Sequence, residues 1–489
     1  MTASTAPRAL SSRLPWTHPL FWFAAISLAH VAMRLLASPA LKWDEAEQIL
    51  WTQELALGYG PQPPLYTWLQ WAMNQVFGPS VLALSLLKHG LLALTYSLMY
   101  LAGRELLDER GAFWASASMV LMPALGWHSV RDQTHTILVT AMACGAWWLL
   151  LRIVRRPRPL DFALLGLVCG FGMLAKYSFA LVAGAMLLAA LSVPEARRAL
   201  LSRGWWWAPL VGLLVVLPHV AWLLSHLTEA TSGTISKMNI QPENGLVKGL
   251  LRLLEGVVPS TLLLWALFAL WAFRSAWWQR PLAPVSPPMH RVFVRYLGLV
   301  LLALAGMVVF AGVSNFKGRW ILPLLCMAPL AAFSARPELQ HHPRARRYTI
   351  AVATMAVILL VAAGIRPWFS GLRGEVDELN HPSIELADAL RGLVLDGWVP
   401  PGDPVPSTRS LARAASVSRG TVVAAYEQLT AEGFLTARPG SATVVNPRLR
   451  ALHPHPGRSG PEPPPPVQGR PLIDLRPGRP WTADVVTSG

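Results

Sequence analysis

The sequence predicts an all-α polytopic membrane protein with about eleven transmembrane helices, followed by a small α+β domain of the winged-helix type and a disordered proline-rich tail. The composition carries this prediction: hydrophobic residues make up 53% of the 489-residue chain, and charged residues only 14%. The mean hydropathy is +0.40, whereas soluble proteins carry about 25% charged residues. A soluble globular fold is therefore excluded for most of the chain.

Apolar windows of about 15 to 23 residues recur along the chain, and several are separated by short basic loops. The first window follows a weakly basic leader, residues 1–15, but it lacks a small-residue cleavage site and contains Arg34. We therefore expect it to remain as a span and not to be removed as a signal peptide. The windows lie at 17–38, 80–103, 111–127, 134–151, 160–175, 177–193, 205–225, 257–273, 296–313, 320–335 and 349–365.

Membrane topology explains most of the net charge of +16, because the excess lies mainly in short loops between the windows. When alternate loops are assigned from a cytoplasmic N-terminus, the inside segments hold 19 Lys and Arg residues and the outside loops hold 8. This bias predicts a multi-pass protein of the bacterial inner membrane, with the loop around Asp44 on the outer face. An odd number of spans also places the C-terminus on the outer face.

Three acids open the loop "KWDEAEQILWTQELALGYGPQPPLYTWL", residues 42–69: Asp44, Glu45 and Glu47. In one interpretation the loop is an interfacial helix whose acids are solvated and whose aromatic side chains form a belt at the membrane surface. In the other, a carboxylate is held there as a general base, which deprotonates an acceptor beside a lipid-borne leaving group.

This loop resembles the first outer loop of the family 39 membrane glycosyltransferases, a branch of the GT-C superfamily that includes protein O-mannosyltransferases and the lipid A aminoarabinose transferase. The resemblance covers about residues 16–380, with further matches in "GWHSVRDQTHTILVTAMACGAWWLL", "GLVCGFGMLAKYSFALVAG" and "SNFKGRWILPLLCMAPLA". Two departures concern the sugar and the acceptor more than the reaction class. Gln62 stands where many relatives have His, and Glu47-Gln48 stands where they have an aromatic-rich stretch.

The resemblance implies an inverting transfer of a sugar from a polyprenyl-phosphate donor to a glycan, lipid or protein acceptor at the outer face. It implies Asp44 as the catalytic base and Glu45 as its companion, since two adjacent acids can raise each other's pKa. Asp132, in another outer loop, is either a third site acid or one half of a local ion pair. No cofactor is assigned, no metal-ligand spacing involves Cys144, Cys169 or Cys326, and a divalent cation is left open.

A departing lipid phosphate needs cations at the membrane surface, which stabilise its charge by hydrogen bonding and by their field. Lys176, Lys317 and Arg319 are the outward-facing candidates for binding the lipid phosphate. The alternative is that these side chains only reach toward the headgroups from the ends of spans. Lys88 and His89 lie inside the second window, where an ionisable pair is costly unless it faces the bundle interior, and their role is left open.

A second domain is predicted over residues 384–447, where the long apolar windows stop. Apolar residues at helical spacing predict a first helix that ends at "DGWVPPGD". Ser407 can cap a second helix, and a third helix runs from Arg419 to Glu432. The stretch "FLTARPGSATVV" follows as a hairpin, and this order of helices and hairpin is the winged-helix plan.

The motifs "PPGDPVPSTRSLA", "VSRGTVVAAYEQLTAEG" and "PGSATVV" in this domain resemble the GntR family of transcription regulators. The resemblance implies that the isolated module binds DNA through Ser407, Arg409 and Arg419. It also implies that Thr421 lies early on the recognition helix and that Gly440 lies in a wing near the minor groove. The alternative for the arginines is solvated surface charge.

The tail, residues 448–489, has ten prolines between 451 and 480, which predicts an extended linker with too little apolar surface to fold. Its segment "PLIDLRPGRP" resembles the start of the aminotransferase-like domain in the pyridoxal-phosphate-dependent branch of the GntR family. Three hypotheses follow: the chain is a membrane glycosyltransferase, a membrane-tethered DNA-binding regulator, or a mis-joined chain with neither activity. The repeated spans and the acidic loop favour the first.

Overall fold

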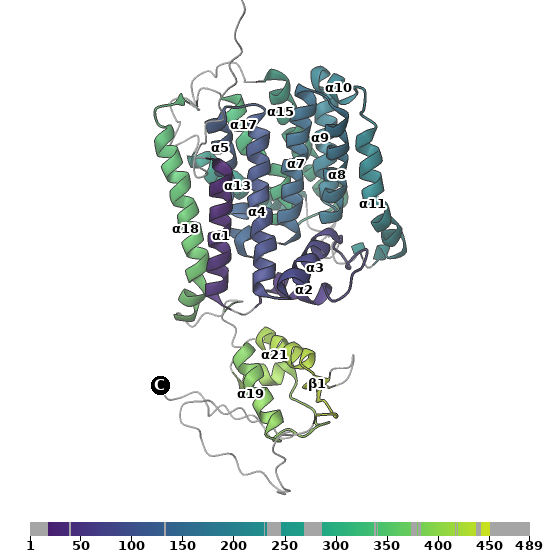
Figure 1. Cartoon of the computed structure of the whole chain (residues 1–489), viewed down its shortest axis with the longest axis vertical. Coiled ribbons are helices and arrows are strands. Elements are labelled where there is room, and N and C mark those ends of the chain that lie inside the picture. The colour runs from purple at the N-terminus through teal and green to yellow at the C-terminus, as the bar shows by residue number, and fades with distance from the viewer. Residues whose placement is uncertain are drawn as a thin grey trace, which may run out of the picture. The chain divides into compact units, whose positions relative to one another are not determined.

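A computed structural model describes residues 18–38, 41–131, 134–228, 230–231, 246–267, 286–336, 339, 341–372, 379, 383–415, 417, 419–436 and 442–449. The chain divides into two compact units, Met1–Arg366 and Pro367–Gly489. The first unit is a bundle of mostly long helices that run side by side (Figure 1). Its elements are α1 (Pro19–Ala37), α2 (Trp43–Trp51), α3 (Leu65–Phe77), α4 (Val81–Arg104), α5 (Glu109–Ala117), η2 (Ser118–Leu121), η3 (Ala124–His128), α6 (Ser129–Arg131), α7 (His135–Arg155), α8 (Pro159–Ala175), α9 (Phe179–Ser192), α10 (Pro194–Leu200), α11 (Trp207–Ser225), α13 (Leu246–Trp265), α15 (Pro287–Ala311), α16 (Gly318–Leu325), α17 (Ala328–Ala335) and α18 (Ala345–Leu372).

Seven helical stretches in the described part of the chain are long and apolar enough to cross a membrane. The number is eight if the bent pair α9 and α10, which turns by 114°, forms one span. The predicted count of eleven is therefore not confirmed by length and composition, although each predicted window overlaps a helix. Window 111–127 is broken at Met122, whose backbone is extended, between the 3-10 turn η2 and the π turn η3. Helix α8 has only 17 residues, whereas a usual span needs about 20.

Helix α7 is the centre of the bundle and packs between α4 and α8, with 83% of its apolar window buried inside the unit. Beside it, α8 and α11 approach closely because α8 carries a glycine at the contact. A Cβ atom on Gly166 would lie 2.2 Å from the carbonyl oxygen of Ala208. Small residues permit such backbone approach between membrane helices, so a larger side chain at Gly166 would force α8 and α11 apart.

The short helices α2 and α3 lie across one end of the bundle (Figure 1). The loops that charge counting assigns to the inner face are tied together by ion pairs. Two pairs join loops or helix ends that lie far apart in the sequence: Arg155 to Glu105 at 3.3 Å and Arg291 to Glu195 at 2.8 Å. Arg152 and Asp161, 2.9 Å apart, pair across a single loop. Their agreement with the predicted grouping supports the alternation of the loops.

The second unit contains three helices, α19 (Ser383–Leu395), α20 (Thr408–Ala414) and α21 (Arg419–Ala431), and two short antiparallel strands, β1 (Leu435–Thr436) and β2 (Val444–Val445). Leu435 pairs with Val445. The order of elements is the predicted one, and Ser407 caps α20 as expected, with its Oγ accepting from the Ser410 amide at 3.2 Å.

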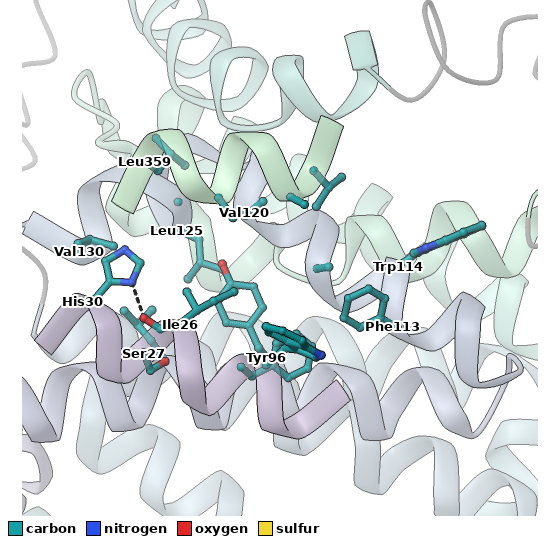
Figure 2. A pocket seen from close by; sticks show the side chains of 18 of the residues that line it. Ile26, Ser27, His30, Tyr96, Phe113, Trp114, Val120, Leu125, Val130 and Leu359 are labelled. Carbon is teal, nitrogen blue, oxygen red and sulfur yellow. Dashed lines mark hydrogen bonds between the residues drawn. The ribbon is translucent and has the colours of Figure 1, made fainter. Parts of the chain in front are cut away.

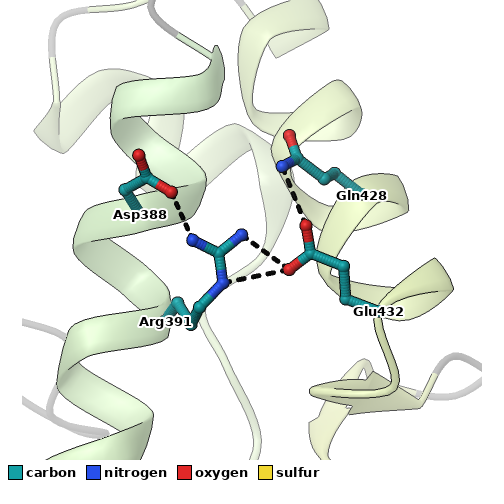
Figure 3. A network of polar contacts seen from close by, with 4 residues as sticks. All are labelled: Asp388, Arg391, Gln428 and Glu432. Carbon is teal, nitrogen blue, oxygen red and sulfur yellow. Dashed lines mark hydrogen bonds and ion pairs between the residues drawn. The ribbon is translucent and has the colours of Figure 1, made fainter. Parts of the chain in front are cut away.

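A polar network joins α19 to α21 in this unit (Figure 3). Arg391 donates to Glu432 from Nε at 3.0 Å and from Nη2 at 2.6 Å, and it also pairs with Asp388. Gln428 donates to the other carboxylate oxygen of Glu432 at 2.9 Å. The network fixes the two helices against each other over an apolar core that includes the fully buried Leu429.

Candidate functional site

The acidic loop begins with a helix whose second acid is buried. Glu45, at 4% exposure, accepts from Arg34 of α1 through Nε at 3.2 Å and Nη2 at 2.6 Å, and from the Lys42 amide at 3.0 Å. Burial raises the pKa of Glu45, but the hydrogen bonds and charge of Arg34 outweigh it and lower the pKa to about 2. Glu45 is therefore an ionised carboxylate that ties the start of α2 to α1.

A tight turn brings the rest of the loop back to the bundle. The backbones of Tyr59 and Gln62 exchange two hydrogen bonds of 3.1 Å, and between them Gly60 has a φ of 54°, which favours glycine. The hydroxyl of Tyr59 donates to the Glu54 carbonyl at 2.8 Å, and the Trp68 indole donates to the Ala56 carbonyl at 2.8 Å. These hydrogen bonds hold the loop in a compact conformation against the start of α3.

A cavity of about 500 Å³ lies beneath this loop. It brings together Asp44 from α2, Lys176 from the turn between α8 and α9, and Arg319 from the start of α16. All three are partly buried, and Lys176 donates from Nζ to Thr136 Oγ1 at 2.9 Å. Three predicted site residues from distant parts of the sequence therefore share one cavity. With Glu47, which also lines it, the described lining holds two carboxylates and two cations.

The other predicted residues of the transferase site lie elsewhere. Glu45 is not among the described residues that line the cavity, and its carboxylate is taken by Arg34. Lys317 is exposed at the N-cap of α16 and is also not in the described lining. Asp132 lies outside the described residues. Among the described residues, no group of three or more His, Cys, Asp or Glu side chains could hold a metal ion.

Sequence reasoning missed several residues of the cavity wall, above all His135 and Tyr177. His135 is the first residue of α7, and Tyr177 follows Lys176. The hydroxyl oxygen of Tyr177 and Nε2 of His219 are 3.1 Å apart, and Nδ1 of His219 donates to the Leu57 carbonyl at 2.6 Å. The available signal was position, because both wall residues border segments predicted to lie on the outer face.

A second cavity, of about 210 Å³, lies among α1, α4, α5 and α18 (Figure 2). Its lining is mostly apolar, and its polar residues include Ser27, His30, His89 and Thr349; the two histidine rings stack at 5.4 Å. His30 contacts the Ile26 carbonyl through Nδ1 at 2.9 Å. The described lining contains no Asp, Glu, Lys or Arg, so it does not pair a carboxylate with cations as the first cavity does.

Only some of the residues predicted to contact DNA are exposed in the described part of the second unit. Arg409 is exposed on α20, where it is accessible to a phosphate. Thr421 is fully buried, which places its side chain in the core of the module and not on its surface. Gly440 and the side chain of Arg419 lie outside the described residues.

Comparison with known proteins agrees with the prediction of a membrane glycosyltransferase followed by a GntR-family domain. Residues 61–222 match the family described as dolichyl-phosphate-mannose-protein mannosyltransferase. Over 376 residues, 75% of each chain, the protein is 31% identical to the lipopolysaccharide core galacturonosyltransferase RgtB of Rhizobium johnstonii. Over 382 residues, 74% of each chain, it is 32% identical to RgtA of the same species, which has the same description. The chain belongs to the GT-C family of membrane glycosyltransferases.

The fold of this GT-C transferase is similar to that of ArnT from Cupriavidus metallidurans, solved bound to undecaprenyl phosphate. The TM-score is 0.51 at 16% identity, over 83% of this chain and 73% of that one. Residues 382–445 match the gntR family of bacterial regulatory proteins. A stretch of 110 residues is 43% identical to the regulator PdxR of Corynebacterium glutamicum, over 21% of this chain and 22% of the regulator. The transferase therefore carries a GntR-family domain.

Proposed function

We propose that this transferase moves a glycosyl group from a polyprenyl-phosphate donor to an acceptor hydroxyl at the outer face of the bacterial inner membrane. The observation that carries the proposal is the cavity in which Asp44 faces the same space as Lys176 and Arg319. ArnT, which shares the fold, was solved with undecaprenyl phosphate bound. Such a ligand combines a phosphate with an apolar chain, and the cavity also has an apolar wall that includes Leu304 and Phe316.

In this mechanism Asp44 is the general base. Its carboxylate takes the proton from the acceptor hydroxyl as that oxygen forms a bond to the anomeric carbon of the sugar. The bond between the anomeric carbon and the phosphate oxygen breaks, and the lipid phosphate leaves with the electron pair. Lys176 and Arg319 stabilise the charge that develops on that phosphate. Attack from the face opposite the leaving group inverts the anomeric centre.

The same cavity supports a uronic acid as the sugar. A phosphodiester donor carries one negative charge at neutral pH, and a uronate adds a carboxylate; Lys176 and Arg319 can each donate hydrogen bonds to one of these groups, while Asp44 and Glu47 supply the acids of the same cavity. RgtA and RgtB are described as galacturonosyltransferases. We therefore assign galacturonosyl transfer to this chain, with a saccharide of the lipopolysaccharide core as the acceptor.

The test is Asp44→Asn in the full-length protein, reconstituted in liposomes with polyprenyl-phosphate-linked galacturonic acid. The substitution keeps the shape and removes the base, so the rate should fall about 10²- to 10⁴-fold. Glu54→Gln is the matched control, because Glu54 is an exposed acid of the same loop outside the cavity lining. Full activity of Asp44→Asn would overturn the assignment of the base. Equal use of a galactosyl donor, which lacks the carboxylate, would overturn the uronate assignment alone.

The GntR-family domain supports a second function, which is DNA binding by the isolated module. The observation in its favour is that the unit has its own apolar core and its own polar network, formed entirely within residues 383–449. In the intact chain we propose that this domain is carried on the same side of the membrane as the transferase site. It would then have no access to the chromosome.

A further inference from the structure

His135 stands in the wall of the transferase cavity, which Asp44 and Lys176 also line. It is the first residue of α7, and it is 4% exposed. The rings of Tyr66 and Trp51 pack around it, with centroids 5.1 Å and 6.2 Å from its own. The imidazole is therefore held in one orientation by aromatic neighbours.

A buried glutamine sets the position of the ring proton. Gln48 of α2 is fully buried, and its Oε1 accepts from the Thr67 hydroxyl at 3.2 Å. This leaves the amide nitrogen of Gln48 facing Nε2 of His135 at 3.4 Å. An amide nitrogen only donates, so Nε2 of His135 must accept and the ring proton lies on Nδ1.

Among the described residues, the proton on Nδ1 meets no acceptor at the distance and angle of an ordinary hydrogen bond. The Ala175 carbonyl lies beside the His135 ring and attracts a ring proton, but it does not meet that distance and angle. A buried polar atom without a partner is costly, and such atoms in native proteins usually meet a ligand, water or ion. Here the atom belongs to a residue that lines the cavity.

We propose that His135 is a neutral hydrogen-bond donor to an anionic oxygen of the glycosyl donor, with Gln48 as the positioning residue that fixes its tautomer. The inference rests on the proposed function and adds to its binding site. The oxygen belongs to the lipid phosphate or to the uronate carboxylate, which present the same chemistry to an N–H group. A neutral donor suits a space that already holds Lys176 and Arg319, because it adds a hydrogen bond without a third positive charge.

The first experiment replaces His135 by asparagine or by glutamine, whose side-chain amides mimic the two ring nitrogens of histidine. In His135→Asn the side-chain amide lies near the position of Nδ1, whereas in His135→Gln it lies near the position of Nε2. Binding of undecaprenyl phosphate and of free galacturonate is measured on the full-length protein in detergent. His135→Gln should weaken one of these ligands about 10- to 100-fold, the range for a hydrogen bond to a charged group. His135→Asn should stay within about threefold of wild type.

The ligand whose affinity falls identifies the oxygen. A loss confined to undecaprenyl phosphate assigns His135 to the phosphate, and a loss confined to galacturonate assigns it to the carboxylate. Unchanged affinity of His135→Gln for both ligands overturns the inference and leaves the proposed function standing. A wild-type protein that binds neither ligand overturns the proposed function, and the inference with it.

The role of Gln48 is tested through its coupling to His135. Gln48→Met removes the amide at similar volume, so the ring proton is no longer held on Nδ1, and binding of the same ligand should weaken about tenfold. In the His135→Asn background the same change should have little effect, because an asparagine has no tautomer to fix. Additive losses in the double variant would show that Gln48 acts only on packing, and would overturn its positioning role.

Discussion

Replacing Glu45 by glutamine should destabilise the membrane unit while leaving the cavity residues in place. The buried carboxylate of Glu45 accepts from Arg34 at 2.6 Å and 3.2 Å. Glutamine keeps an oxygen that can accept from the Lys42 amide, so the substitution isolates the loss of charge. Arg34, at 8% exposure, would then be a buried cation without its carboxylate.

The pKa of Glu45 gives the size of the effect. A fall from the ordinary value of 4.5 to about 2 corresponds to about 3 kcal/mol of stability, since one pKa unit is worth about 1.4 kcal/mol. Removing one partner of a buried ion pair typically costs about 3 to 5 kcal/mol, which agrees. Because the pKa is lowered in the folded state, this stability is present above about pH 4.5 and is lost as the pH falls toward 2.

The assay is thermal unfolding of the purified protein in detergent, followed by tryptophan fluorescence at pH 7 and at pH 3. Glu45→Gln should unfold at a clearly lower temperature than wild type at pH 7, and the difference should shrink at pH 3. Asp44→Asn is the matched control, since it should lose transfer and keep stability. Wild-type stability of Glu45→Gln, combined with lost transfer, would refute the reasoning and return Glu45 to the catalytic site.

Two further predictions concern the C-terminal half. The fragment 383–447, expressed alone, should fold and bind duplex DNA with an affinity that falls steeply with salt, because phosphate contacts dominate; Arg409→Ala should reduce the salt slope by about one, and a folded fragment without salt-sensitive binding would count against the DNA contacts. In the full-length protein, alkaline phosphatase fused after Val445 should be active, as expected on the outer face. Fluorescence from a cytoplasm-only reporter at the same point would instead place the module inside the cell.

Asp44, Lys176 and Arg319 could be found from the sequence because each lies in a short polar segment between apolar windows. The difference between Asp44 and Glu45 could not, because adjacent helical residues point about 100° apart and only the packing of α1 decides which one meets Arg34. The contact between Gln48 and His135 joins residues 87 positions apart. No local pattern signals such a pair.

The number of membrane spans also could not be predicted from the sequence alone. Hydropathy located every apolar window, but it is insensitive to breaks such as the one at Met122 and to helices as short as α8. Whether such segments cross depends on where their ends lie. Helix α8 begins near the ion pair of Asp161 with Arg152, and it ends at Lys176 in the wall of the cavity. We therefore expect this 17-residue helix to cross, even though it is shorter than an ordinary span.

The same tracing of helix ends supports the predicted side of the C-terminus. The broken segment from α5 to α6 follows Glu105, which pairs with Arg155, and leads to Thr134 in the cavity wall. Helix α18 starts at the opposite end of the bundle from Asp44, after the basic segment 336–348, and near its end a Cβ on Gly364 would meet Met33. Met33 precedes Arg34, the partner of Glu45 in the acidic loop. The chain thus leaves the membrane unit at the end that holds the cavity, so the alkaline phosphatase fusion should be active on the side where sugar transfer takes place.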